Sequence, residues 1–164
     1  MFEDVQGGEL SREQIDHLLA DPVLARLATA TGASPRPHVV PLWFLWDGTA
    51  VWMSSFRSTR KMHDLMDNPY CSVLVDQAES GVDFWAVLFD GEAELVTEPR
   101  AFVEEMSTRI YTRYLGQEGT ADPRPQSWIH DPENQLIMLV PRRTRAWYSV
   151  KRGSALSARL AQAT

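Results

Sequence analysis

The chain has 164 residues, of which 44% are hydrophobic and 23% are charged, and this balance is typical of one globular domain rather than of a disordered chain. Its formal net charge of −6 opposes attraction to nucleic acid and to anionic membranes, so an anionic ligand needs a local group of cations. No apolar run reaches the ~20 residues of a membrane span. We therefore expect neither a nucleic-acid partner nor a membrane.

The use of cysteine indicates a compartment. Cys71 is the only cysteine, so no internal disulfide can form, and the N-terminus shows no hydrophobic signal segment. Both features are typical of proteins of the reducing cytoplasm. We therefore expect a cytoplasmic location.

The first expected elements are an arm and a short helix. Residues 1–10 are polar and contain glycine, which predicts a loose arm. Ser11 and Gln14 have the spacing of a capping box that opens a helix, and Asp21-Pro22 ends it. The apolar face of this helix consists of Ile15, Leu18 and Leu19.

The hydrophobic period then changes from 3.6 to 2, which predicts strands. Residues 24–30 (LARLATA) form the first strand, and residues 38–46 (HVVPLWFLW) form a long second one. Asp47-Gly48 is a strong hairpin signal, after which residues 49–55 (TAVWMSS) return. These segments predict a meander of three antiparallel strands.

A second helix is expected over Arg60–Asp67, with three apolar residues on one face, namely Met62, Leu65 and Met66. Residues 71–76 predict a strand. Residues 84–96 predict either a strand pair or one bulged strand around Asp90-Gly91.

A third helix begins at Pro99, since proline favours the first helical position. It should run to about Leu115, where Gly116 closes it. Residues 119–132 contain three prolines and read as loops. Two last strands and a short frayed helix are expected at 135–140, 144–150 and 154–164.

The strands come in runs instead of alternating with helices. This order disfavours a doubly wound parallel sheet and favours an α+β fold, mainly antiparallel β, in which a closed or half-closed barrel carries flanking helices.

A candidate anion site follows the strand at residues 49–55. That strand ends in two hydroxyls, a polar loop follows, and the next helix begins with two cations. The backbone amides and the dipole at a helix start favour an anion such as a phosphate. The residues of this cluster are Ser54, Ser55, Ser58, Arg60 and Lys61. The alternative is that Ser58 or Thr59 only caps the helix while the cations lie in solvent.

The ordered motifs resemble the pyridoxamine 5′-phosphate oxidase-like split-barrel family, which includes FMN-binding and deazaflavin (coenzyme F-420)-binding oxidoreductases. The resemblance covers roughly residues 20–150. The matching pieces are LARLATA (24–30), PHVVPLWFLWDG (37–48), VWMSS (51–55), STRKMHDLMDNP (58–69), SVLVD (72–76), DGEAELV (90–96), RYLG (113–116) and VPRRTRAW (140–147).

The resemblance implies a six-stranded split β-barrel that forms a homodimer with two cofactor sites shared between the subunits. It divides the chain into an N-terminal arm and helix (1–22), a flavin-binding barrel (23–150) and a C-terminal tail (151–164). It also implies that Lys61 contacts the cofactor phosphate together with Arg60 and the hydroxyls of Ser54, Ser55 and Ser58. The strand Val39, Val40, Pro41 and Leu42 would run beside the flavin ring.

The implied activity is hydride transfer between bound FMN or coenzyme F-420 and a small organic substrate. The sequence does not separate the two cofactors, and it names no catalytic acid or base. Leu42-Trp43 stands where the true pyridoxamine phosphate oxidases carry a basic residue, so pyridoxamine phosphate is a disfavoured substrate. One alternative is a non-catalytic flavin- or haem-binding carrier or sensor, and another is a structural homodimer without cofactor.

Other residues invite weaker interpretations. The four histidines do not pair at metal-ligand spacing, so we expect no metal site. His38 lies near the expected ring and is a candidate proton donor. Trp85 and Trp128 would line the pocket from the partner chain, and Arg109 and Arg113 would reach an anionic cofactor tail across the dimer.

Overall fold

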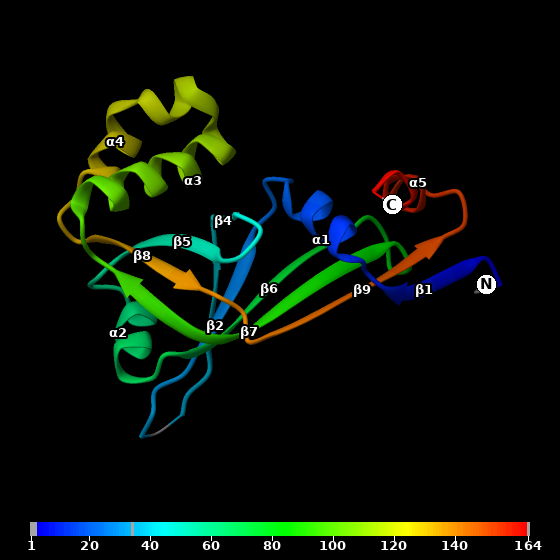
Figure 1. The fold of residues 1–164 in the computed structure, drawn as a ribbon, viewed down its shortest axis with the longest axis horizontal. Helices are drawn as coiled ribbons and strands as arrows, with labels where there is room; N and C mark the ends of the chain where they lie inside the picture. Colours follow the sequence, from blue (N-terminus) through cyan, green and yellow to red (C-terminus); the bar gives the residue numbers. More distant parts are fainter. Residues whose placement is uncertain (1–2, 34, 164) are drawn as a thin grey trace.

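The computed structural model describes residues 3–33 and 35–163. Figure 1 shows a long, curled antiparallel sheet with helices along both sides. The strands are β1 (Val5–Glu9), β2 (Ala25–Thr29), β3 (His38–Leu42), β4 (Phe44–Trp46), β5 (Val51–Phe56), β6 (Tyr70–Ala78), β7 (Phe84–Val96), β8 (Asn134–Leu139) and β9 (Arg143–Lys151). The helices are α1 (Arg12–Leu19), α2 (Arg60–Asp67), α3 (Arg100–Ala121), α4 (Pro123–Ile129) and α5 (Ala155–Gln162).

The sheet is a split barrel. Its strand order is β3-β2-β6-β7-β8-β5-β4, with β9 paired to β7 and β1 paired to β9. All of these pairs are antiparallel. The two end strands, β3 and β4, are joined in the chain through Trp43 alone. The predicted α+β fold with a split β-barrel is therefore confirmed, although the sheet of the described residues has nine strands instead of six.

Strand β7 joins the two halves of the barrel. Residues 84–92 pair with β6, while residues 93–96 pair with β8. Of the two interpretations of residues 84–96, the single strand is thus correct. Gly91 lies at the changeover, where a Cβ atom would come within 2.9 Å of the Leu139 Cδ1 atom. The close approach of β7 to the end of β8 therefore requires glycine at this position.

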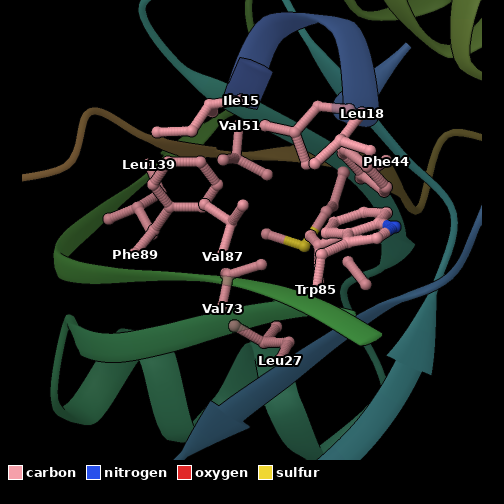
Figure 2. Close-up of a cluster of buried hydrophobic side chains, with 14 of the residues drawn as sticks. Ile15, Leu18, Leu27, Phe44, Val51, Val73, Trp85, Val87, Phe89 and Leu139 are labelled. Carbon is pink, nitrogen blue, oxygen red and sulfur yellow. The ribbon is translucent and has the colours of Figure 1, made fainter. Parts of the chain in front are cut away.

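The main core fills the barrel. Figure 2 shows side chains from β2, β6 and β7 meeting those of α1 and β4 in one apolar cluster. The labelled members are Ile15, Leu18, Leu27, Phe44, Val51, Val73, Trp85, Val87, Phe89 and Leu139. Helix α1 buries the predicted apolar face of Ile15, Leu18 and Leu19. Its predicted capping box is also present, since the Ser11 amide donates to the Gln14 side chain and the Gln14 amide donates to the Ser11 hydroxyl.

The two ends of the chain join this core. Residues 5–9 form β1 and pair with β9, so the prediction of a loose arm is wrong there. Four of its five residues are exposed, so the segment has no apolar alternation that would predict a strand. Its strand conformation depends on pairing with β9, which is distant in the sequence. The predicted C-terminal helix is present as α5, which buries Leu156 and Leu160.

The predicted long strand over residues 38–46 is broken at Trp43. Its first part pairs with β2 and its second part with β5, so the expected three-strand meander is divided between the two ends of the sheet path. The Tyr114 hydroxyl accepts the Phe44 amide at 3.1 Å and donates to the Val23 carbonyl at 2.6 Å. Trp43 stacks on the Tyr114 ring at 4.9 Å. Helix α3 thus satisfies the backbone groups that the corner exposes.

Two further predictions fail for local reasons. Residues 119–132 are not only loops, because Pro123 occupies the first position of α4, where its missing amide costs nothing. Met66 is 50% exposed instead of buried. The inward face of α2 carries Met62, Asp64 and Leu65, which are buried, and Met66 lies away from it.

Helix α3 is interrupted where the sequence predicts its end, since Gly116 has a φ of 70°. In the described ranges, no helix combines the length and the apolar character needed to cross a membrane.

Candidate functional site

The first turn of α2 leaves donors free. Thr59 is the N-cap residue, but its side chain makes no capping bond, because its hydroxyl donates to the Phe56 carbonyl at 2.9 Å. Ser58 is exposed. The amides at this helix start therefore have no side-chain acceptor among the described residues and can bind an external anion.

Lys61 is the second residue of α2, and its side chain is half-buried. Within the described part of the chain, no hydrogen bond or ion pair is formed by its ammonium group. Burial lowers the pKa of Lys61, because desolvation disfavours the charged form and no anion compensates it. An unpaired cation beside free helix amides is the donor set that a phosphate requires.

Arg60 is held by other groups. Its Nε atom lies 3.8 Å from the Asp64 carboxylate, and its Nη2 atom donates to the Arg36 carbonyl at 3.4 Å. Asp64 is only 3% exposed and accepts a hydrogen bond from the Thr29 hydroxyl at 2.8 Å. Arg60 therefore connects the start of α2 to the segment between β2 and β3.

The serines of β5 do not face the same way. The Ser54 hydroxyl donates to Asn134 Oδ1 at 2.7 Å and receives a bond from Ser107 at 3.3 Å, so it faces α3. The Ser55 hydroxyl lies 3.2 Å from that of Thr59, on the side of α2. Successive side chains of a strand point to opposite faces. Only Ser55 and Ser58 thus share the region of Lys61.

Strand β3 places the three residues expected beside a ring on two faces. Val39 is 59% exposed, and Pro41 is exposed on the same face. Val40 points inward and packs against the core. Because β3 is an end strand of the sheet path, its outward face and its unpaired edge are open, and proline is tolerated there.

A pocket of about 380 Å³ lies between β3, β5 and the helices α3 and α4. Its lining residues are Leu24, Pro41, Leu42, Trp43, Ser54, Phe56, Ile110, Tyr111 and Trp128, none of which is charged. Tyr111 meets Trp43 edge to face at 5.2 Å and lies 6.1 Å from the Trp128 ring. Burial raises the pKa of Tyr111, although a hydrogen bond with Ser54 opposes the shift. The pocket is therefore apolar with two neutral hydroxyls.

The sequence interpretation placed Trp128 in a pocket of the partner chain, and it did not identify Tyr111 as a pocket residue. Tyr111 follows Ile110 on α3. The hydrophobic period of this helix predicts its buried face, but it does not predict which strands that face covers. Only the packing of α3 over β4, β5 and β8, visible in Figure 1, brings Tyr111 to Ser54.

Comparison with known proteins identifies the family of this chain. The family model of pyridoxamine 5′-phosphate oxidase matches residues 11–148. The chain belongs to this family. No curated protein matches its sequence.

Solved structures share the family fold. A conserved hypothetical protein from Mycobacterium tuberculosis is 24% identical with a TM-score of 0.70, over 89% of this chain and 88% of that one. An F420 reductase is 21% identical with a TM-score of 0.61, over 79% and 94%. A FAD-binding protein from Mesorhizobium loti is 19% identical with a TM-score of 0.62, over 90% and 99%. At these identities the likeness establishes the fold alone.

Two interpretations of this pyridoxamine 5′-phosphate oxidase family member need correction. Arg113 does not point toward a partner, because its guanidinium donates to the carbonyls of Leu19 and Asp21 and lies 4.6 Å from the Phe44 ring. Trp85 is 1% exposed within the core of its own chain, so it cannot line a pocket of another. Trp128 lines the pocket of its own chain.

Proposed function

We propose that this protein is an oxidoreductase that binds FMN or coenzyme F-420 and passes a hydride between this cofactor and a small organic substrate. The observation that carries the proposal is the half-buried ammonium of Lys61 at the start of α2, which has no partner among the described residues. Desolvation of that cation is unfavourable in the free protein, and a bound phosphate would offset it. Family membership and the flavin-type cofactors named for two structural neighbours support the same ligand class.

The chain's own residues would bind and orient the cofactor, while the bound flavin or deazaflavin supplies the hydride chemistry. Lys61, the Ser58 hydroxyl and the free amides of α2 would hold the phosphate. Arg60 and Ser55 would support this region from behind, through Asp64 and Thr59. The outward face of β3, at Val39 and Pro41, offers an apolar surface for the ring.

We propose the 380 Å³ pocket as the substrate site, since it includes Pro41 of β3 and so adjoins that surface. Its walls favour a planar apolar molecule, and the Tyr111 hydroxyl can donate to one neutral acceptor such as a carbonyl oxygen. No lining residue carries a charge. A phosphorylated substrate such as pyridoxamine phosphate would therefore lose its hydration there without an ion partner.

A homodimer with shared cofactor sites belongs to the same proposal. Val39 pairs with Ala28, Ala28 pairs with Ser72, and Tyr70 lies two residues further on the same strand, so these residues share the outward face of the sheet. Val39 and Tyr70 are both large and exposed, as expected of a face that a second copy covers. We also propose the cytoplasm as its location, because Cys71 remains a buried thiol.

The first test is a titration of the purified protein with FMN and with coenzyme F-420, followed by tryptophan fluorescence. We expect saturable quenching by at least one of them, because Trp43 and Trp128 line the adjoining pocket. Absence of binding by both would refute the proposal.

The matched variants use the chain's only two lysines. Lys61→Met should weaken cofactor binding by about 1.5–3 kcal/mol, or roughly 10- to 150-fold, through loss of a charge-assisted bond. The same substitution should not lower the melting temperature of the cofactor-free protein, because it removes a cation whose partial burial is unfavourable. Lys151→Met, on exposed β9, should leave affinity unchanged. An unchanged affinity of the Lys61 variant would remove this residue from the site.

Turnover needs its own measurement. We expect the bound cofactor to be reduced by a nicotinamide or by a deazaflavin-reducing partner, and then reoxidised by a neutral quinone-type acceptor. Tight binding without either reaction would identify a carrier or sensor instead of an enzyme.

A further inference from the structure

A closed triangle of hydrogen bonds lies behind the apolar pocket. It joins Ser54 of β5, Asn134 of β8 and Ser107 of α3. The Ser54 hydroxyl lies 2.7 Å from Asn134 Oδ1, Asn134 Nδ2 lies 3.0 Å from the Ser107 hydroxyl, and the two serine hydroxyls lie 3.3 Å apart. Asn134 is 2% exposed and Ser107 is fully buried, so the groups of the triangle satisfy one another instead of binding bulk water.

The backbone carbonyl of Ile129 fixes the direction of every bond in the triangle. A carbonyl can only accept, so the Asn134 side-chain atom at 3.1 Å from it must be the amide nitrogen. Asn134 Oδ1 therefore faces Ser54, which donates to it. The second amide proton of Asn134 goes to the Ser107 hydroxyl, which in turn donates its own proton to Ser54.

Ser54 consequently has no proton left for the pocket that it lines. A hydroxyl group has one donor proton and two acceptor lone pairs. In Ser54 the proton is bound to Asn134 and one lone pair accepts from Ser107, so one lone pair remains free. Tyr111 carries the other hydroxyl group among the lining residues, and it can donate. The pocket thus offers one acceptor and one donor side by side.

We propose that Ser54 is a specificity-determining residue that makes this pocket select a hydroxyl group on an apolar ring, as in a neutral phenol or hydroquinone. This inference rests on the proposed function, since it assigns the substrate class of the same pocket. Such a hydroxyl donates to the free lone pair of Ser54, while its oxygen accepts the Tyr111 proton. An ether of the same ring can only accept, so it leaves the Ser54 lone pair without a partner among apolar walls.

Two matched ligands measure this selectivity. β-Naphthol and its methyl ether share one planar ring system, but only the naphthol can donate a hydrogen bond. The naphthol is neutral at neutral pH, because phenolic groups ionise at about pH 10. One net hydrogen bond corresponds to a roughly 2- to 12-fold lower Kd for the naphthol than for the ether. Both Kd values are measured by equilibrium dialysis against the full chain, with and without saturating FMN or coenzyme F-420.

Two serine variants separate the contact with the ligand from the integrity of the triangle. Ser54→Ala removes the free lone pair, so the preference for the naphthol should disappear. Ser107→Ala removes a hydroxyl of the same triangle that does not line the pocket. Because Ser54 can still donate to Asn134 in this control, the preference should remain.

A third variant changes the polarity of the pocket. In Asn134→Leu, a side chain of similar shape cannot accept the Ser54 proton, which becomes free to enter the pocket. The ether should then bind this variant more tightly than it binds the wild type. A merely structural role of the triangle predicts no such gain, and an unchanged or weaker affinity of the folded variant for the ether would contradict the proton directions. If Asn134→Leu does not fold, the two serine variants decide the question alone.

The outcomes are distinct. A preference for the naphthol that is lost in Ser54→Ala and retained in Ser107→Ala supports the proposal. Equal Kd values for the two ligands in the wild type, absence of binding by both, or the same preference in both serine variants would overturn it. The proposed function is judged separately: if FMN and coenzyme F-420 both fail to bind, that function is refuted, whereas cofactor binding without a preference for the naphthol refutes only this inference.

Discussion

The corner between β3 and β4 depends on one hydroxyl group, and Tyr114→Phe removes that group alone. Its two short hydrogen bonds are lost, from the Phe44 amide at 3.1 Å and to the Val23 carbonyl at 2.6 Å, together with a longer one to the Phe44 carbonyl at 3.5 Å. The ring remains to stack on Trp43. The change therefore tests the polar contacts of the corner without opening a cavity.

The expected cost follows from these two contacts. A neutral hydrogen bond contributes about 0.5–1.5 kcal/mol net, and a buried group left without a partner costs about 1–3 kcal/mol. Phe44 is fully buried, so its amide cannot turn to water, whereas Val23 is partly exposed. We therefore expect a loss of about 2–4 kcal/mol. For a chain of this length the melting temperature should fall by roughly 5–15 °C.

Calorimetry and urea unfolding measure this loss directly. Thr97→Val is the control, because Thr97 is exposed and its hydroxyl makes no hydrogen bond within the described residues, so this variant should change stability by less than about 0.5 kcal/mol. If Tyr114→Phe melts within about 1 °C of the wild type, the corner is not held by this hydroxyl. The explanation for the broken strand would then be wrong.

Two other predictions concern the barrel. Burial raises the pKa of the Cys71 thiol to about 12, while an unfolded thiol ionises at about 8.5. The folded state thus retains a proton that the unfolded state loses, so stability is fully present below about pH 8.5 and falls as the pH rises toward 12. Urea unfolding across this range should show a shallower alkaline decline in Cys71→Ala, and an identical decline would contradict the assignment. Gly91→Ala should cost about 1–3 kcal/mol, because the new Cβ meets Leu139 Cδ1 at 2.9 Å and the Val140 carbonyl at 3.2 Å. Gly81→Ala, with no atom within 4 Å of its Cβ position, should unfold like the wild type in the same assay.

The sequence predicts elements whose signals are local. The capping box before α1, the hairpin at Asp47-Gly48 and the bounds of α2 all depend on residues within one turn of each other. Strand β1 and the break at Trp43 depend on distant partners instead. The first needs β9, and the second needs Tyr114, some 70 residues away. No local pattern contains that information.

The candidate site shows the same division. Arg60 and Lys61 can be recognised as neighbouring cations from the sequence alone. In the structure the Lys61 ammonium is partly desolvated and has no anionic partner among the described residues. The alternation of β5 implies that Ser54 and Ser55 face opposite sides, and the structure gives their hydroxyls different partners, Asn134 and Thr59. The pairing of Arg60 with Asp64 could be suspected from the helical spacing. The burial of Asp64 against Thr29 required the fold.

Strand β7 has a consequence for how the molecule comes apart. It belongs to both halves of the barrel, pairing with β6 and β9 at its start and with β8 at its end. If β7 detaches, each half of the barrel loses a paired strand. Detachment of β7 from one half alone would require the strand to bend near Gly91. We therefore expect the barrel to unfold as one cooperative unit, and we expect a ligand bound near β3 and α2 to protect β9 and α5 at the far end against opening as well.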